Sequence, residues 1–146
     1  MDLFANLAVG FSIAVTPQNL LYCFIGVLYG TILGVLPGIG AVVGISVLLP
    51  LTFNMQPTSA FIMLAGIYYG CAYGGSTSSI LVNTPGEGSS VVTCFDGHEM
   101  ALQGRAKAAL ATAAIGSFFA GTVATALIML VAVPISRVGL LFTPAE

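Results

Sequence analysis

The sequence predicts an all-α integral membrane protein, a polytopic helical bundle in which Pro-Gly sequences break some helices into discontinuous or re-entrant segments. Hydrophobic residues make up 58% of the chain, charged residues 5%, and the mean hydropathy is +1.06. A soluble domain usually carries about a quarter charged residues, so this composition could not offer water an adequate polar surface. Residues 3–86 carry no formal charge, and Pro-Gly pairs occur within and at the end of this run, at residues 37–38 and 85–86.

The few charges and cysteines exclude several classes of protein. Three basic and five acidic residues give a net charge of −2 with no basic patch, so no nucleic-acid partner is expected. The N-terminal pair Met1-Asp2 is acidic, which does not fit the positive start of a cleavable signal peptide. We interpret the widely spaced cysteines as buried small apolar residues rather than a disulfide framework: Cys23, Cys71 and Cys94.

The first third of the chain predicts a short helix and then a membrane segment. Residues 3–15 are apolar at helical spacing, but such a helix would be roughly 20 Å long and too short to cross a bilayer core of about 30 Å. Residues 16–19 end this helix and offer a cap for a membrane segment over residues 20–36. Glycines recur every fourth residue on one face of that segment and predict close contact with a neighbouring helix: Gly26, Gly30 and Gly34.

The middle of the chain alternates helices with breaks. A break at residues 37–40 is followed by a second half-helix over residues 41–49, which stops at Pro50, and by a connector over residues 51–57. Thr58 or Ser59 can cap the next segment, which runs to Val82. Within it, residues 74–79 read Gly-Gly-Ser-Thr-Ser-Ser, and these polar groups are expected to face protein or water rather than lipid.

The last third predicts a loop and one long span. Residues 89–100 are short and mixed, and they lead into a charged cluster expected to form a water-exposed or interfacial loop: Asp96, His98, Glu99, Arg105 and Lys107. One histidine with two acids lacks convincing metal-ligand spacing, so no metal site is expected there. Residues 108–133 are uncharged and about 39 Å long as a helix, which Pro134 would end and Arg137 would anchor at the far interface.

The two breaks share the pattern Pro-Gly-x-Gly, at residues 37–40 and 85–88, 48 residues apart. Because proline favours the first helical position, each break is expected to start a new half-helix whose free N–H groups point back into the break. Thr84, with Glu87 three residues later, also matches a capping box. A helix N-terminus carries about half a positive charge and attracts anions, so two such ends favour a carboxylate ligand.

The candidate site therefore consists of backbone amides and of hydroxyl or amide side chains, because no Lys or Arg lies inside the expected membrane core. The residues expected to bind substrate are Gly38, Gly40, Ser76, Thr77, Asn83, Thr84, Gly86, Ser89 and Ser90. Glu87 is either a coupling-ion or proton site or a helix-capping carboxylate. Backbone carbonyls freed near Gly38 and Pro85 could hold Na⁺. The alternative is a pair of kinked helices whose hydroxyls bond back to their own backbone.

Five stretches resemble the large membrane subunit of the tripartite tricarboxylate transporter family (TctA-like permeases), over a likeness that runs from about Asn19 to the C-terminus. The stretches are Gly30–Gly40, Leu48–Phe53, Gly66–Ser76, Asn83–Glu87 and Asp96–Ala106. The resemblance implies a multi-pass subunit in a bacterial inner membrane that imports carboxylates, driven by an ion gradient. It implies as partners a small membrane subunit (TctB-like) and a periplasmic solute-binding protein (TctC-like).

The sequence and the resemblance together lead to one functional expectation and two alternatives. The expectation is secondary-active import of tricarboxylates or related carboxylates, coupled to Na⁺ or H⁺, without a cofactor and without enzymatic activity. Residues 1–146 would then be the N-terminal part of a TctA-like permease domain in a longer chain. The alternatives are a truncated, non-transporting assembly partner, and an intramembrane serine hydrolase suggested by Gly74-Gly75-Ser76, for which His98 is the only histidine.

Overall fold

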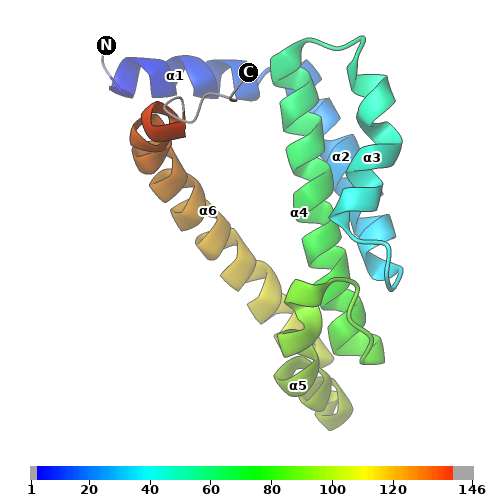
Figure 1. Ribbon diagram of the computed structural model, residues 1–146. Helices are drawn as coiled ribbons and strands as arrows, with labels where there is room; N and C mark the ends of the chain where they lie inside the picture. The colour runs from blue at the N-terminus through cyan, green and yellow to red at the C-terminus, as the bar shows by residue number, and fades with distance from the viewer. Residues whose placement is uncertain (1–2, 140–146) are drawn as a thin grey trace. The chain divides into compact units, whose positions relative to one another are not determined.

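The computed structural model describes residues 3–139, and all regular structure in that range is helical (Figure 1). The order is α1 (Leu3–Ala14), α2 (Pro17–Val35), α3 (Ala41–Thr52), α4 (Pro57–Val82), a short 3₁₀ turn (Gly88–Ser90), α5 (Val91–Met100), a π-type turn (Ala101–Arg105) and α6 (Ala106–Gly139). The chain divides into two compact units after Ala111, so most of α6 forms a unit of its own. The predictions for Met1-Asp2 and for the Arg137 side chain concern parts of the chain outside those that the structure describes.

Two helical stretches among the described residues are long and apolar enough to cross a membrane by length and composition. They are Pro17–Val35 and Gly88–Met129, and the second runs through the turn that separates α5 from α6. α4 has 26 residues but does not qualify, because its glycines and the hydroxyl run at residues 76–79 lower its hydropathy. α3 is apolar but has only 12 residues.

Helices α2 and α4 form the tightest pair in the first unit, and they run in the same direction (Figure 1). A Cβ atom added at Gly30 would overlap the backbone of Ile67, and one at Gly70 would overlap the backbone of Val27. The glycines one turn before and after these behave in the same way. Six glycines, three on each helix, therefore let the two backbones touch, as in the small-xxx-small pairs of membrane helices: Gly26, Gly30, Gly34, Gly66, Gly70 and Gly74.

Polar contacts fix the start of this pair. Asn19 and Ser59 are both buried, and the Ser59 hydroxyl donates to Asn19 Oδ1 at 2.6 Å. The Asn19 amide also donates to the Ile13 carbonyl at 2.8 Å, which ties the end of α1 to α2. Pro17 and Pro57 occupy the first turns of α2 and α4, where their missing N–H groups cost nothing.

Helix α3 packs against this pair through side chains. Ala41 forms a buried cluster with Ile67 and Cys71 of α4, and partly buried apolar side chains surround it. At Gly44 of α3 the nearest groups are the side chains of Leu33, Ile67 and Cys71, not backbone atoms. α3 therefore contacts α2 and α4 through side chains, whereas α2 and α4 contact each other through their backbones.

The predicted start of the second half-helix at residue 41 is confirmed, because α3 begins at Ala41. Pro37 and Pro85 lie in non-helical linkers rather than at first helical positions, and the next helical residues are Ala41 and Gly88. Two expected helix ends are wrong. α3 continues two residues past Pro50 to Thr52, and α6 continues through the position of Pro134. α4 runs to Val82 as expected, and the hydroxyls of Ser76 and Thr77 within it bond to the helix itself.

The charged cluster is helical rather than an extended loop. Asp96, His98 and Glu99 lie on α5, and the chain bends at Gly104, whose φ of 77° glycine adopts without steric cost. Arg105 and Lys107 follow that bend at the start of α6 and are exposed. His98 Nδ1 lies 3.0 Å from the Ile80 carbonyl, so the ring carries its proton on Nδ1 and holds α5 to the last turns of α4.

Candidate functional site

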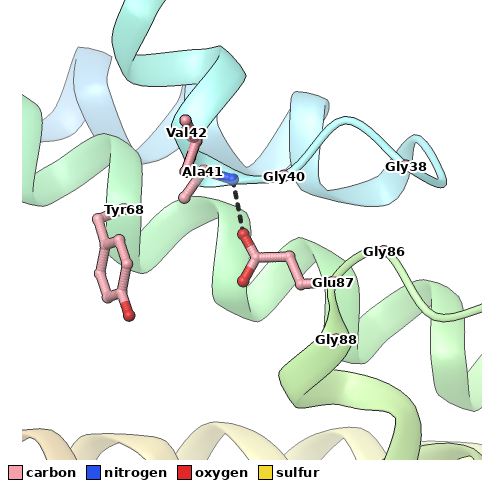
Figure 2. Close-up of a pocket in the computed structure, with 8 residues that line it drawn as sticks. All are labelled: Gly38, Gly40, Ala41, Val42, Tyr68, Gly86, Glu87 and Gly88. Carbon is pink, nitrogen blue, oxygen red and sulfur yellow. Dashed lines mark hydrogen bonds between the residues drawn. The ribbon is translucent and has the colours of Figure 1, made fainter.

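The two Pro-Gly linkers come together around one pocket (Figure 2). We call residues 36–40 the first linker and residues 83–87 the second linker. The pocket has a volume of about 370 Å³, in the range of small-molecule sites. It is lined by Gly38, Gly40, Ala41, Val42, Tyr68, Gly86, Glu87 and Gly88.

The Glu87 carboxylate crosses from the second linker to the end of the first. Its Oε1 accepts a hydrogen bond from the Ala41 backbone N–H at 2.7 Å, shown as the dashed line in Figure 2. Ala41 is the first residue of α3, and the first amides of a helix have no partner within the helix. Glu87 therefore caps α3, a helix 46 residues earlier in the sequence, and satisfies one of its free donors.

The expected capping box between Thr84 and Glu87 is wrong. The Thr84 hydroxyl donates to the Val82 carbonyl at 3.2 Å, and Glu87 itself is the residue before the 3₁₀ turn. There the Glu87 N–H donates to Ser90 Oγ at 3.2 Å, while Ser90 Oγ donates back to the Glu87 carbonyl at 2.8 Å. Ser90 thus fixes the backbone of Glu87, which leaves the carboxylate to reach α3.

Gly86 packs the second linker against α2 and α4. It is buried, and an added Cβ would overlap the Gly34 carbonyl oxygen and lie 2.7 Å from the Gly75 Cα. The linker therefore rests on the end of α2 and on α4 at a place that only glycine can occupy. Because Gly86 precedes Glu87, this packing sets where the carboxylate begins.

Two further residues that line the pocket lie at the starts of helical segments, where backbone amides have no partner within the helix. Val42 lines the pocket, and its amide makes no hydrogen bond within residues 3–139, whereas the next two amides of α3 bond to the Gly40 carbonyl. Gly88 also lines the pocket and opens the second helical run. Tyr68 and Val42 were missed from the sequence, because their place in the pocket depends on α3 folding back against α4.

The other candidate residues lie elsewhere. The hydroxyls of Ser76 and Thr77 donate to the carbonyls one turn earlier, those of Ala72 and Tyr73, at 3.0 and 2.9 Å. Ser78 and Ser79 both donate to the Gly75 carbonyl. This is the arrangement of the alternative in which hydroxyls bond their own backbone, and it leaves these groups out of the pocket between the linkers.

Asn83 and Ser89 are the last of the residues expected from the sequence to bind substrate. Asn83 ends α4 in a left-handed conformation, with φ 55° and ψ 30°, and is exposed. Ser89 is exposed on the 3₁₀ turn. Of the predicted residues, the structure therefore brings Gly38, Gly40, Gly86 and Glu87 to one pocket and places the remaining ones around it or on α4. Within the described range, no three His, Cys, Asp or Glu side chains gather as a metal site would require.

Comparisons with known proteins agree with the resemblance found in the sequence. Residues 20–146 match the model of the tripartite tricarboxylate transporter TctA family. The chain is also 58% identical over all of its 146 residues to an Agrobacterium vitis protein described as an uncharacterized 52.8 kDa protein in the TAR-I ttuC' 3' region, and it spans 29% of that relative's length. No solved structure matches the chain. The match covers most of the chain, and the chain therefore belongs to the tripartite tricarboxylate transporter TctA family, a family of membrane transporters.

Proposed function

We propose that this chain forms the N-terminal part of a multi-pass permease subunit in a bacterial inner membrane. The permease imports tricarboxylates or related carboxylates by secondary-active transport, together with a small membrane subunit and a periplasmic solute-binding protein. Na⁺ or H⁺ supplies the driving force. Family membership supports the transporter class, and the apolar helices support membrane insertion.

One observation supports the place of the substrate site. Both Pro-Gly linkers line the same pocket, and a carboxylate, that of Glu87, already accepts a hydrogen bond there from an amide of α3. Non-helical backbone at membrane depth is tolerated where it lines a cavity, and discontinuous helices hold substrates in many secondary transporters. We therefore propose that the two linkers break membrane helices and form part of a carboxylate site.

In this proposal, backbone amides provide most of the binding. The free N–H of Val42 and the amide of Gly88 donate to a substrate carboxylate, and the Tyr68 hydroxyl adds a third donor from α4. A helix N-terminus stabilises an anion through these free amides and through its dipole. Gly38, where no atom lies within 4 Å of an added Cβ, lets the ligand approach the backbone closely. Ser76, Thr77, Asn83, Thr84, Ser89 and Ser90 stay predictions for the wider site.

Uptake of radiolabelled citrate tests the function. The permease and its two partner subunits are co-expressed in a strain without its own citrate uptake, and uptake is measured under a Na⁺ gradient and under a pH gradient. We expect uptake under one of the two gradients. Absence of uptake of citrate and of shorter di- and tricarboxylates would overturn the proposed function.

A second set of variants tests the site. Tyr68→Phe removes only a hydroxyl in the pocket, and we expect it to raise the KM for citrate; Ser76→Ala and Thr84→Ala test the wider site in the same assay. Glu99→Gln is the matched control, because Glu99 is exposed on α5 outside the pocket. Unchanged kinetic constants in Tyr68→Phe, Ser76→Ala and Thr84→Ala would contradict the site while leaving the transport function standing.

The role of these 146 residues by themselves is a separate proposal. The chain spans 29% of its relative's length, which also fits a part that packs against other segments and does not transport alone. Expressing residues 1–146 with and without the remaining segments of a full-length relative separates the two cases. Citrate uptake by residues 1–146 with the partner subunits alone would exclude the non-transporting role.

A further inference from the structure

Helix α3 is attached to the rest of its unit in a different way from α2 and α4. The α2–α4 pair is held by direct backbone contact at its glycines. α3 instead contacts the pair through apolar side chains around Ala41, Ile67 and Cys71. Within residues 3–139, the Glu87–Ala41 bond is the only hydrogen bond that joins α3 to a residue distant in sequence.

This difference matters in a membrane. Lipid tails are as apolar as leucine, so apolar side chains gain little by packing against protein instead of lipid, and close backbone packing and hydrogen bonds decide which helices stay together. By that criterion the α2–α4 pair is fixed. The position of the α3 N-terminus depends mainly on one hydrogen bond.

The other end of that bond is firmly held. Gly86 is packed against Gly34 and Gly75, and Ser90 makes reciprocal hydrogen bonds with the Glu87 backbone. Glu87 thus extends from a fixed linker to a helix end that little else holds. Its side chain also lies beside Gly40, where an added Cβ would be 3.6 Å from Oε1 and 3.7 Å from Cγ.

We propose that Glu87 is a positioning residue that latches the N-terminus of α3 against the second linker, and that α3 moves relative to the α2–α4 pair when this bond is released. The movement separates the two linkers and changes access to the pocket between them. The role of this movement in transport rests on the proposed function, whereas the latch itself can be measured without transport.

Distance measurements test the latch. Spin labels are placed at Val43→Cys on α3 and Val82→Cys at the end of α4, both exposed and outside the pocket lining, in the full permease with its native cysteines replaced by alanine. We expect one narrow distance distribution without substrate. Glu87→Ala, which removes the acceptor, and Ala41→Pro, which removes the donor, should each add a second, longer distance.

Conservative variants provide matched controls. Glu87→Gln keeps an acceptor oxygen and Ala41→Ser keeps the N–H, so both should retain the single distance. Proline suits Ala41 because this residue opens α3 and Gly40 before it is extended, with φ −70° and ψ 179°. The same narrow distribution in all four variants would overturn the latch, whether or not the permease carries citrate.

A reversible cross-link tests whether the latch must open during transport. The pair Gly40→Cys and Glu87→Cys replaces the hydrogen bond by a disulfide. We expect oxidation to abolish citrate uptake and dithiothreitol to restore it, while each single-cysteine variant is unaffected by oxidation. Full uptake by the cross-linked protein would show that the linkers need not separate. Should the reduced double variant not transport, the spin-label distances decide the proposal alone.

Discussion

Ser59 and Asn19 are joined by a hydrogen bond of 2.6 Å, and the two residues hold the same place in two parallel helices. Each is the third residue of its helix, two positions after a proline. The correspondence continues along both helices at a spacing of 40 residues, with glycine at 26 and 66, 30 and 70, and 34 and 74. α2 and α4 are thus two similar segments that pair face to face, joined at their starts by the polar groups and along their length by the glycines.

The Asn19–Ser59 bond should contribute measurably to stability. Ser59→Ala removes one hydrogen bond, and we expect a loss of about 0.6 to 1.7 kcal/mol, as for polar pairs in other membrane bundles. Asn19→Ala should cost more, because Asn19 also donates to the Ile13 carbonyl. Unfolding by SDS in mixed micelles measures both, and the double variant should be no less stable than Asn19→Ala. The control is Ser12→Ala, whose exposed hydroxyl bonds only its own helix.

The glycines between α2 and α4 should not tolerate even a methyl group. Gly30→Ala and Gly70→Ala place Cβ against backbone atoms of the other helix, which cannot move aside as a side chain can. We expect a loss of about 1–3 kcal/mol each, measured by the same SDS titration. Gly116→Ala on α6 is the matched control, since no atom lies within 4 Å of its added Cβ. Equal stability of Gly30→Ala and Gly116→Ala would contradict the close pairing.

His98 should hold α5 to the end of α4. His98→Ala removes the hydrogen bond to the Ile80 carbonyl, and losing about 1 kcal/mol would raise local opening roughly fivefold. Hydrogen exchange of the α5 amides measures this opening. His98→Asn should restore protection, because the Asn Nδ2 lies close to the position of the ring Nδ1. Glu99→Gln, exposed on the same helix, should leave the exchange rates unchanged.

Gly104 should be required for the bend between α5 and α6. Its φ of 77° is left-handed, and alanine there costs about 1–2 kcal/mol. We expect Gly104→Ala to lower the SDS concentration at which the protein unfolds. Gly10→Ala inside α1 should raise this SDS concentration or leave it unchanged. Alanine has a higher helix propensity than glycine, and its Cβ would meet no atom within 4 Å. If Gly104→Ala leaves stability unchanged, the bend does not need glycine.

The positions of the helices were largely predictable, because apolar length and proline or glycine punctuation are local properties. The sequence predicted the helix over residues 3–15, the segment after Pro17 and the close-packing role of Gly26, Gly30 and Gly34, and the structure has all three. The start of the second half-helix at residue 41 was also predicted, whereas the helix ends expected at Pro50 and Pro134 were wrong. A left-handed Gly38 and the contact of Glu87 with Ala41 accompany the start of α3 four residues after Pro37.

The candidate site was predictable only in part. Pro-Gly-x-Gly marked both linkers, since glycine and proline interrupt helices whatever surrounds them. The hydroxyl run at residues 76–79 drew attention as a polar site, yet each of these hydroxyls bonds a carbonyl one turn or less earlier on α4. Local pattern does not distinguish a hydroxyl that faces a ligand from one that satisfies its own helix, because both uses suit the same residue types.

The sequence by itself determined that the chain is helical, that it belongs in a membrane, and that its backbone leaves the helix at the two Pro-Gly pairs, because these follow from transfer free energies and from the φ restrictions of single residues. Only the tertiary structure decided that α2 and α4 run in parallel, that the two linkers share a pocket, and that Glu87 caps α3. The Glu87–Ala41 contact joins residues 46 apart, and it exists only because α3 reverses direction between two parallel helices.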